Sequence, residues 1–161
     1  MKKFVGILTA IAVFTGCTFG DAFIDRRGAH NGLIAHLNDI AEAETNFFDE
    51  YYALGAGVDV APFVASVGEF RAEYEELAAY VSDTKFGSTQ QFYKTDFDET
   101  FGPYTEEYVT TAEDFATTLE ANGFDVEAQL SLTKTLDEYV VGFGDQYDAY
   151  AVKVDENAGV Y

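Results

Sequence analysis

Residues 60–81, VAPFVASVGEFRAEYEELAAYV, contain the most regular pattern in the chain and decide its fold class. Large apolar side chains recur there at alternating three- and four-residue steps, which places them on one stripe of an α-helix. Asp59 before this stretch suits a helix N-cap, and Pro62 is tolerated within a first turn. The stripe consists of Val60, Phe63, Val67, Phe70, Tyr74, Leu77 and Val81.

Three further segments of the chain repeat apolar residues with the same helical period. The first, residues 33–54, has Glu44 as the single polar break in its stripe and ends at Gly-Ala-Gly (55–57), a common helix stop. The others span residues 97–119 and 132–154. Four amphipathic helices with short links predict an all-α domain, which we interpret as an antiparallel up-down four-helix bundle.

The dipeptide Gly102-Pro103 interrupts the third helical pattern and leaves two arrangements open for residues 88–121. Either one long helix is kinked there, or a short helix ends and Pro103 opens the next, and the suitability of proline at a helix start favours two pieces. Residues 96–107 (DFDETFGPYTEE) share acidic positions with an EF-hand calcium loop, but Phe101 stands where that loop needs glycine. We therefore interpret this stretch as helical.

The chain opens with MKKFVGILTAIAVFTGCTFG (1–20), which contains its only cysteine, Cys17. Lys2 and Lys3 precede an apolar run, residues 4–14, that is well short of the roughly 20 residues needed to span a bilayer. A basic start followed by a short apolar run is typical of a secretory signal peptide.

The residues FTGC (14–17) resemble the lipobox of bacterial lipoproteins, which has an apolar residue, two small residues and a cysteine. Phe14 departs from the Leu, Val or Ile that is usual in this family. The resemblance covers residues 1–17 and implies cleavage between Gly16 and Cys17, followed by acylation of the Cys17 thiol. It therefore implies attachment to a membrane through lipid on Cys17.

This interpretation divides the chain into three parts. Residues 1–16 form the signal peptide, residues 17–32 form a lipidated, glycine-containing tether, and residues 33–161 form an acidic helical-bundle domain. Thr18 differs from the Asp that retains such lipoproteins at the inner membrane. The resemblance thus favours the outer membrane, with the domain facing the periplasm or the cell surface.

The charge of the chain restricts its partners. Without residues 1–16, the chain has 29 Asp and Glu against seven Lys and Arg, a formal charge near −22. Such a charge repels nucleic acid phosphates and disfavours a protein body lying flat on anionic lipid. With 15 Phe and 11 Tyr, the chain is nevertheless too aromatic for an acidic disordered segment.

The sequence provides few candidates for catalysis or cofactor binding. The two histidines, His30 and His36, lack the preceding glutamate of a di-iron E-x-x-H motif, and the only methionine is Met1. His36 and Asp39 stand three residues apart, a spacing that fits a surface hydrogen bond better than a catalytic dyad. We expect no cofactor, no specific metal site and no enzymatic activity.

Tyrosines are the remaining unusual feature, and they lie on or beside the predicted stripes. They are predicted mainly to pack in the core, with Tyr51, Tyr74, Tyr108 and Tyr147 as candidates for a groove that binds a partner. We expect a lipid-anchored, non-enzymatic envelope protein that acts as a binding or adaptor module for another protein. The alternative is a periplasmic bundle that binds divalent cations weakly, or a small ligand.

Overall fold

The computed structural model describes residues 26–156, with the side chains of residues 126 and 128 excepted. This part of the chain is helical and contains no strand, which confirms the all-α prediction. The predicted signal peptide, Cys17 and residues 17–25 of the tether lie outside the described residues. The elements are α1 (Arg26–Ala53), α2 (Ala61–Asp83), a 3₁₀ turn (Ser88–Gln90), α3 (Gln91–Asp96), a π-helical segment (Phe97–Phe101), α4 (Gly102–Asn122) and α5 (Val126–Glu156).

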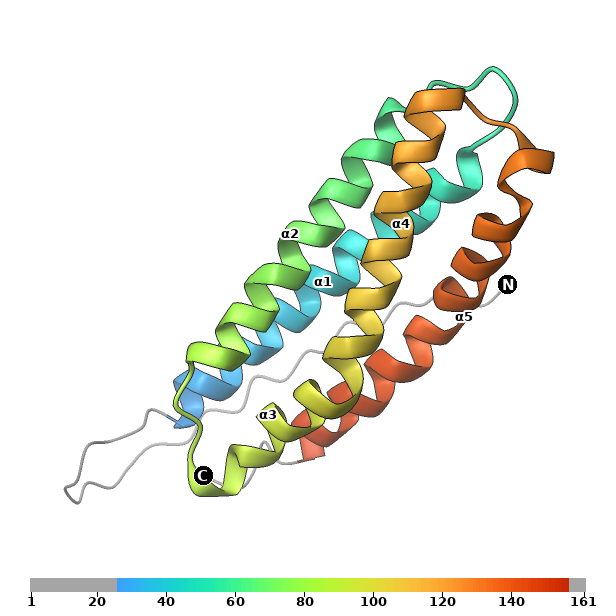
Figure 1. Ribbon diagram of the computed structural model, residues 1–161. Coiled ribbons are helices and arrows are strands. Elements are labelled where there is room, and N and C mark those ends of the chain that lie inside the picture. The colour runs from blue at the N-terminus through green and yellow to red at the C-terminus, as the bar shows by residue number, and fades with distance from the viewer. Residues whose placement is uncertain (1–25, 157–161) are drawn as a thin grey trace.

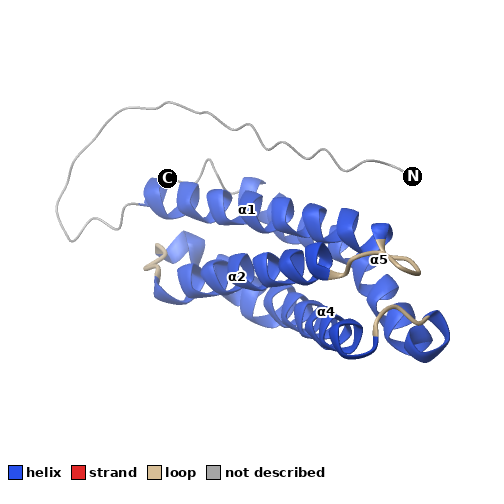
Figure 2. Cartoon of the chain, turned by 90° about the horizontal axis from the view of Figure 1, so that it is seen from above, coloured by secondary structure: helices blue, strands red, loops and turns tan. Residues whose placement is uncertain are grey.

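The four long helices α1, α2, α4 and α5 pack along one another as a helical bundle (Figure 1). The contact between α1 and α2 is the most extensive, and α4 packs on both α2 and α5. Direct contact between the α1 and α5 backbones is sparser. Figure 2 shows that loops are confined to the short connections between helices.

One aromatic ring from each long helix meets at the centre of the bundle. Phe47 of α1, Phe70 of α2, Tyr108 of α4 and Phe143 of α5 are all buried. The Tyr108 ring lies 5.5 Å from Phe47, 5.1 Å from Phe70 and 5.7 Å from Phe143, between ring centroids. The pairs with Phe47 and Phe70 pack edge-to-face, which adds about 0.5–1.5 kcal/mol per pair beyond the burial of area. We call these four residues the central ring cluster.

The stripe of residues 60–81 faces the core as predicted. Phe63, Val67, Phe70, Leu77 and Val81 are at most 3% exposed and Tyr74 is 8% exposed, whereas Val60 precedes the helix and is partly buried. Asp59 accepts a hydrogen bond from the Ala61 amide at 3.0 Å, which satisfies one of the free N–H groups at the helix start.

The start of α1 differs from the sequence prediction. The helix begins at Arg26 rather than Leu33, so residues 26–32, which we expected in the tether, belong to the folded domain. Ala29 and His30 are buried, and the Tyr80 hydroxyl donates a hydrogen bond to the Ala29 carbonyl at 2.8 Å. Because Arg26 and Gly28 are not large apolar residues, the helical repeat of apolar side chains is not visible in this part of the sequence. Contacts with α2 and α3 stabilise this first turn.

Residues 88–122 resolve the two arrangements left open by Gly102-Pro103. The π-helical segment joins α3 to α4 without a loop, and Pro103 lies in the first turn of α4. The Gly102 amide donates to the Phe97 carbonyl, five residues back, so the hydrogen-bond ladder shifts immediately before the proline, which has no amide hydrogen. The chain thus forms two α-helices with a continuous helical backbone between them.

Gly102 is required by close packing at this junction. A Cβ atom there would lie 2.9 Å from both the Phe97 carbonyl oxygen and its ring. The Tyr74 hydroxyl also donates to the Gly102 carbonyl at 3.2 Å, which connects α2 to the start of α4. The π-helical segment therefore has little room to move.

We predict opposite effects for alanine at two helical glycines. Gly102→Ala should lower the free energy of unfolding by about 1–3 kcal/mol, because the added methyl group must displace backbone as well as the Phe97 ring. At Gly68 in α2, an added Cβ would meet no neighbouring atom within 4 Å. Gly68→Ala should therefore raise the free energy of unfolding by up to about 1 kcal/mol, because alanine favours the helix. Urea denaturation of both variants measures the difference, and equal effects would contradict the packing argument.

Candidate functional site

A column of residues spaced by seven along α1 places three polar side chains against other helices. The column contains His30, Leu37, Glu44 and Tyr51, and seven-residue spacing keeps them on one side of the helix. His30 and Tyr51 are buried and Glu44 is half-buried. Their hydrogen-bond partners lie on α3, α4 and α5, so this polar column links α1 to each of these helices.

Glu44 occupies the middle of the column, next to the central ring cluster. The Tyr108 hydroxyl donates to Glu44 Oε1 at 3.2 Å, and Tyr108 is fully buried. Burial raises the pKa of Glu44 to about 7, and the hydrogen bond from Tyr108 opposes this rise only in part. Burial also raises the pKa of Tyr108 far above its usual value, so the hydroxyl remains a donor. Glu44 is thus a carboxyl group that changes charge near neutral pH.

Tyr51 connects α1 to α5 near the end of α1. Its hydroxyl donates to Asp137 Oδ1 at 2.9 Å and approaches the Thr133 carbonyl oxygen at 3.3 Å. Burial and the Asp137 carboxylate raise the pKa of Tyr51 beyond its usual range. Since the backbones of α1 and α5 make few direct contacts, this side-chain bridge holds that side of the bundle together.

His30 lies at the opposite end of the column, against α3 and the end of α5. Its Nδ1 is 3.0 Å from the Tyr93 hydroxyl, which also lies 3.4 Å from the Val154 carbonyl oxygen. The Tyr150 hydroxyl donates to the Tyr93 carbonyl at 2.9 Å. Burial lowers the pKa of His30, and nearby Asp155 only partly offsets this. At neutral pH His30 is therefore an uncharged structural group.

The structure does not bring the four candidate groove tyrosines together on the surface. Tyr51, Tyr74 and Tyr108 are at most 8% exposed, and each hydroxyl bonds to a neighbouring helix. Tyr147 is half-buried, and its hydroxyl has no hydrogen-bond partner among the described residues. Three of the four therefore contribute to packing between helices in this structure.

An exposed aromatic pair, which the stripe analysis passed over, lies on the outer side of α1. Phe48 is 40% exposed, Tyr52 is 58% exposed, and their ring centroids are 4.6 Å apart. They are four residues apart in the sequence, which makes them neighbours on a helix surface. The sequence signal that could have revealed this pair is two aromatic residues four positions apart, beside the buried stripe of α1 rather than within it.

Carboxylates on the outer surface mostly pair with donors or face solvent. Arg71 of α2 forms ion pairs with Glu106 at 2.9 Å and Glu113 at 2.6 Å on α4, while Glu107 accepts a hydrogen bond from the Tyr139 hydroxyl at 3.0 Å. Adjacent Glu106 and Glu107 thus point to different helices, as their spacing predicts.

The residues that could hold a cation do not converge in the described part of the chain. A pocket of about 300 Å³ between α1 and α2 is lined by Asn46, Asp49, Glu50, Pro62, Ala65, Ser66 and Glu69. Within residues 26–156, no group of three or more His, Asp or Glu side chains is arranged to bind a metal ion.

Comparisons with known proteins reveal no relationship for this chain. No protein-family model matches it, no curated protein matches it and no solved structure matches it. Between residues 26 and 156, none of the helices is both long enough and apolar enough to cross a membrane.

We predict that Glu44 makes stability depend on pH. The pKa of the Glu44 carboxyl is about 7 in the folded protein and 4.5 ordinarily, so ionisation of Glu44 opposes folding. The stabilisation that the protonated carboxyl allows is complete below pH 4.5 and is lost as the pH rises towards 7. Over this interval the wild type should lose up to about 3 kcal/mol more unfolding free energy than Glu44→Gln.

Denaturation at a series of pH values measures this difference. Glu42→Gln, which removes an exposed acid from the same helix, is the matched control and should keep the wild-type slope. If Glu44→Gln and Glu42→Gln had the same pH dependence, Glu44 would not be the group responsible.

Proposed function

We propose that this protein is a lipid-anchored, non-enzymatic binding module of the bacterial cell envelope. The observation that carries the proposal is the sequence FTGC (14–17) after a short apolar run, which supports cleavage at Gly16–Cys17 and acylation of Cys17. The folded domain supports it further, because α1 begins at Arg26, a short distance along the chain from that cysteine. We place the protein at the outer membrane, facing the periplasm or the cell surface.

We also propose that the bundle has an antiparallel up-down order. Support comes from the short connections, residues 54–60 between α1 and α2 and residues 123–125 between α4 and α5. Gly57 and Gly123 have positive φ angles of 79° and 70°, which allow the chain to turn sharply after each helix. Figure 1 is consistent with neighbouring helices running in opposite directions.

A non-enzymatic role is supported by what the buried reactive groups do. The His30 ring contacts the Tyr93 hydroxyl, the Tyr51 hydroxyl bonds to Asp137, and Glu44 accepts from Tyr108. Each of these groups joins two helices, so each has a structural use.

A protein partner in the envelope is supported by the exposed pair Phe48 and Tyr52. Aromatic side chains are enriched among the residues that dominate binding energy in protein interfaces. Tyr52 lies 26 residues beyond Arg26 on one helix, about 39 Å away at 1.5 Å per residue. A partner could therefore contact this pair while the start of α1 remains near the membrane.

Lipidation predicts a specific mass for the mature protein. The protein isolated from cells should begin at Cys17 and carry diacylglycerol or a triacylated form of it, as intact mass spectrometry measures. A Cys17→Ser variant should lose the lipid and leave the membrane fraction, because the thiol is the atom that is acylated. An unmodified wild-type protein with a free Cys17 thiol would overturn the anchor.

Partner binding predicts a surface-specific effect. The double variant Phe48→Ser and Tyr52→Ser should lose at least about tenfold in partner capture from envelope extracts, with unchanged thermal unfolding, because both rings are exposed. Val141→Ser removes an apolar side chain that is 76% exposed on α5 and is the matched control. Equal capture by the double variant and the control would place the partner elsewhere.

A further inference from the structure

The lysines and arginines of the described chain gather at one end of the bundle. We call this end the base and define it as residues 26–30, 80–97 and 152–156. Three elements meet there: the start of α1, the end of α2 with its link to α3, and the end of α5. Its charged residues are Arg26, Arg27, Lys85, Lys94 and Lys153, with Asp83, Asp96, Asp155 and Glu156.

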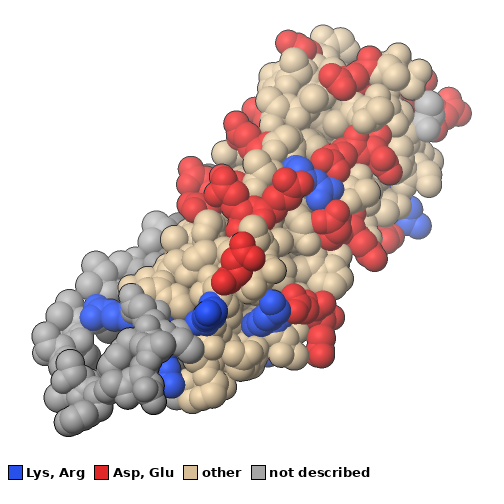
Figure 3. Space-filling model, turned by 60° about the vertical axis from the view of Figure 1, so that its left-hand side comes forward, with Lys and Arg blue, Asp and Glu red and all other residues tan. Residues whose placement is uncertain are grey.

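The rest of the described chain is strongly acidic by comparison. It carries two basic residues, Arg71 and Lys134, against 23 Asp and Glu, whereas the base carries five against four. Figure 3 shows most of the blue atoms towards one end and red atoms scattered over the rest of the visible face. The bundle therefore has one end of nearly balanced charge and sides that are repelled by other anions.

Contacts within the base hold several of its basic side chains in place. Lys94 Nζ donates to the Ser82 carbonyl at 3.3 Å, and Lys153 pairs with Asp96 at 2.8 Å. The Arg26 side chain lies against Gly87, where a Cβ would come within 2.6 Å of its Nε. Lys85, in the link after α2, is exposed. These positive charges are therefore distributed over an end surface rather than along one helix.

Covalent connectivity places this end closest to the proposed lipid. From Cys17 to Arg26 there are nine residue steps, so an extended chain spans at most about 30 Å. The other end of α1, a 28-residue helix, lies a further 40 Å or so from Arg26. Of the two ends of the bundle, the base is the one that remains within reach of a membrane surface whatever the conformation of the tether.

We propose that the base is a docking surface for anionic lipid headgroups and that the bundle stands on the membrane with its acidic sides directed away. The proposal rests on the lipid anchor at Cys17 proposed above. Basic residues near an anionic leaflet favour association by about fivefold each, and acidic sides lying on the same leaflet are repelled. The two effects together select an upright orientation from those that the tether permits.

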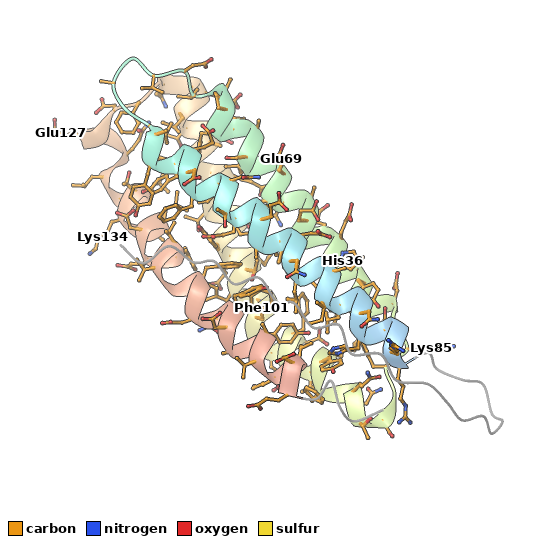
Figure 4. All side chains as sticks on the ribbon, turned by 180° about the vertical axis from the view of Figure 1, so that it is seen from behind. His36, Glu69, Lys85, Phe101, Glu127 and Lys134 are labelled. Carbon is orange, nitrogen blue, oxygen red and sulfur yellow. The ribbon has the colours of Figure 1, made fainter. Side chains whose placement is uncertain are left out.

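Two exposed lysines provide a direct test of this orientation. Figure 4 shows Lys85 beside the start of α1 and Lys134 on α5 towards the other end of the bundle. The mature lipidated protein is added to preformed vesicles of phosphatidylcholine, with or without anionic phosphatidylglycerol. A membrane-impermeant, amine-reactive reagent then labels the lysines, and mass spectrometry measures the labelling rate of each.

On anionic vesicles, labelling of Lys85 should slow by about fivefold relative to phosphatidylcholine vesicles, and labelling of Lys134 should not change. High salt should remove the difference, since screening shortens the Debye length to about 3 Å at 1 M. If the protein stays bound to vesicles while both lysines label at unchanged rates, the anchor stands and the docking surface is wrong. If the mature protein isolated from cells carries no lipid on Cys17 and binds neither vesicle, both proposals are overturned.

Charge-reversal variants separate the base from general electrostatic attraction. Hydrogen exchange of the link at residues 84–87 should slow on anionic vesicles for the wild type and for Lys134→Glu. In Lys85→Glu most of that protection should be lost, because the reversed charge is repelled by the same headgroups. Equal loss in Lys85→Glu and Lys134→Glu would show that net charge, rather than the base, determines the contact.

Discussion

The central ring cluster is the interaction on which the rest of the bundle depends. Phe47, Phe70, Tyr108 and Phe143 each come from a different long helix, and their mutual packing sets the distances between helix axes. Burying four large aromatic side chains contributes about 1.5–3 kcal/mol each. Phe47 of α1 and Phe143 of α5 each contact the rings of α2 and α4, so the cluster joins all four long helices.

The polar column links α1 to two other long helices. The Tyr51 hydroxyl of α1 bonds to Asp137 of α5, and the Tyr108 hydroxyl of α4 bonds to Glu44 of α1. A buried polar group that lacks a partner costs about 1–3 kcal/mol, so these bonds fix how the helices align along their axes. Glu44 adds a dependence on pH that an apolar residue at the same position would not.

Charge then distinguishes the two ends of an otherwise uniform bundle. The base combines Arg26, Lys85 and Lys94 from three separate segments, while the exposed pair of Phe48 and Tyr52 lies far from it along α1. Under the proposed function, the base would contact the membrane and the exposed pair would contact a partner.

Much of the fold could be predicted because helical periodicity is a local property. The stripe of residues 60–81, the helix stop before residues 55–57 and the polar break at Glu44 all follow from local sequence along a single helix. The start of α1 at Arg26 and the π-helical segment before Pro103 could not, since contacts with other helices stabilise them. The lipid anchor at Cys17 remains a prediction from the sequence, because it lies outside the described residues.

The sequence by itself determined the all-helical class, the large excess of acid and the candidate lipidation site, since each depends only on residue type and order. Tertiary structure alone decided that Tyr51, Tyr74 and Tyr108 pack inside, and that basic residues from distant segments share one end. The physical reason is that periodicity defines which side of a helix is apolar. It does not define which helix packs against that side, or how the two helices align along their axes.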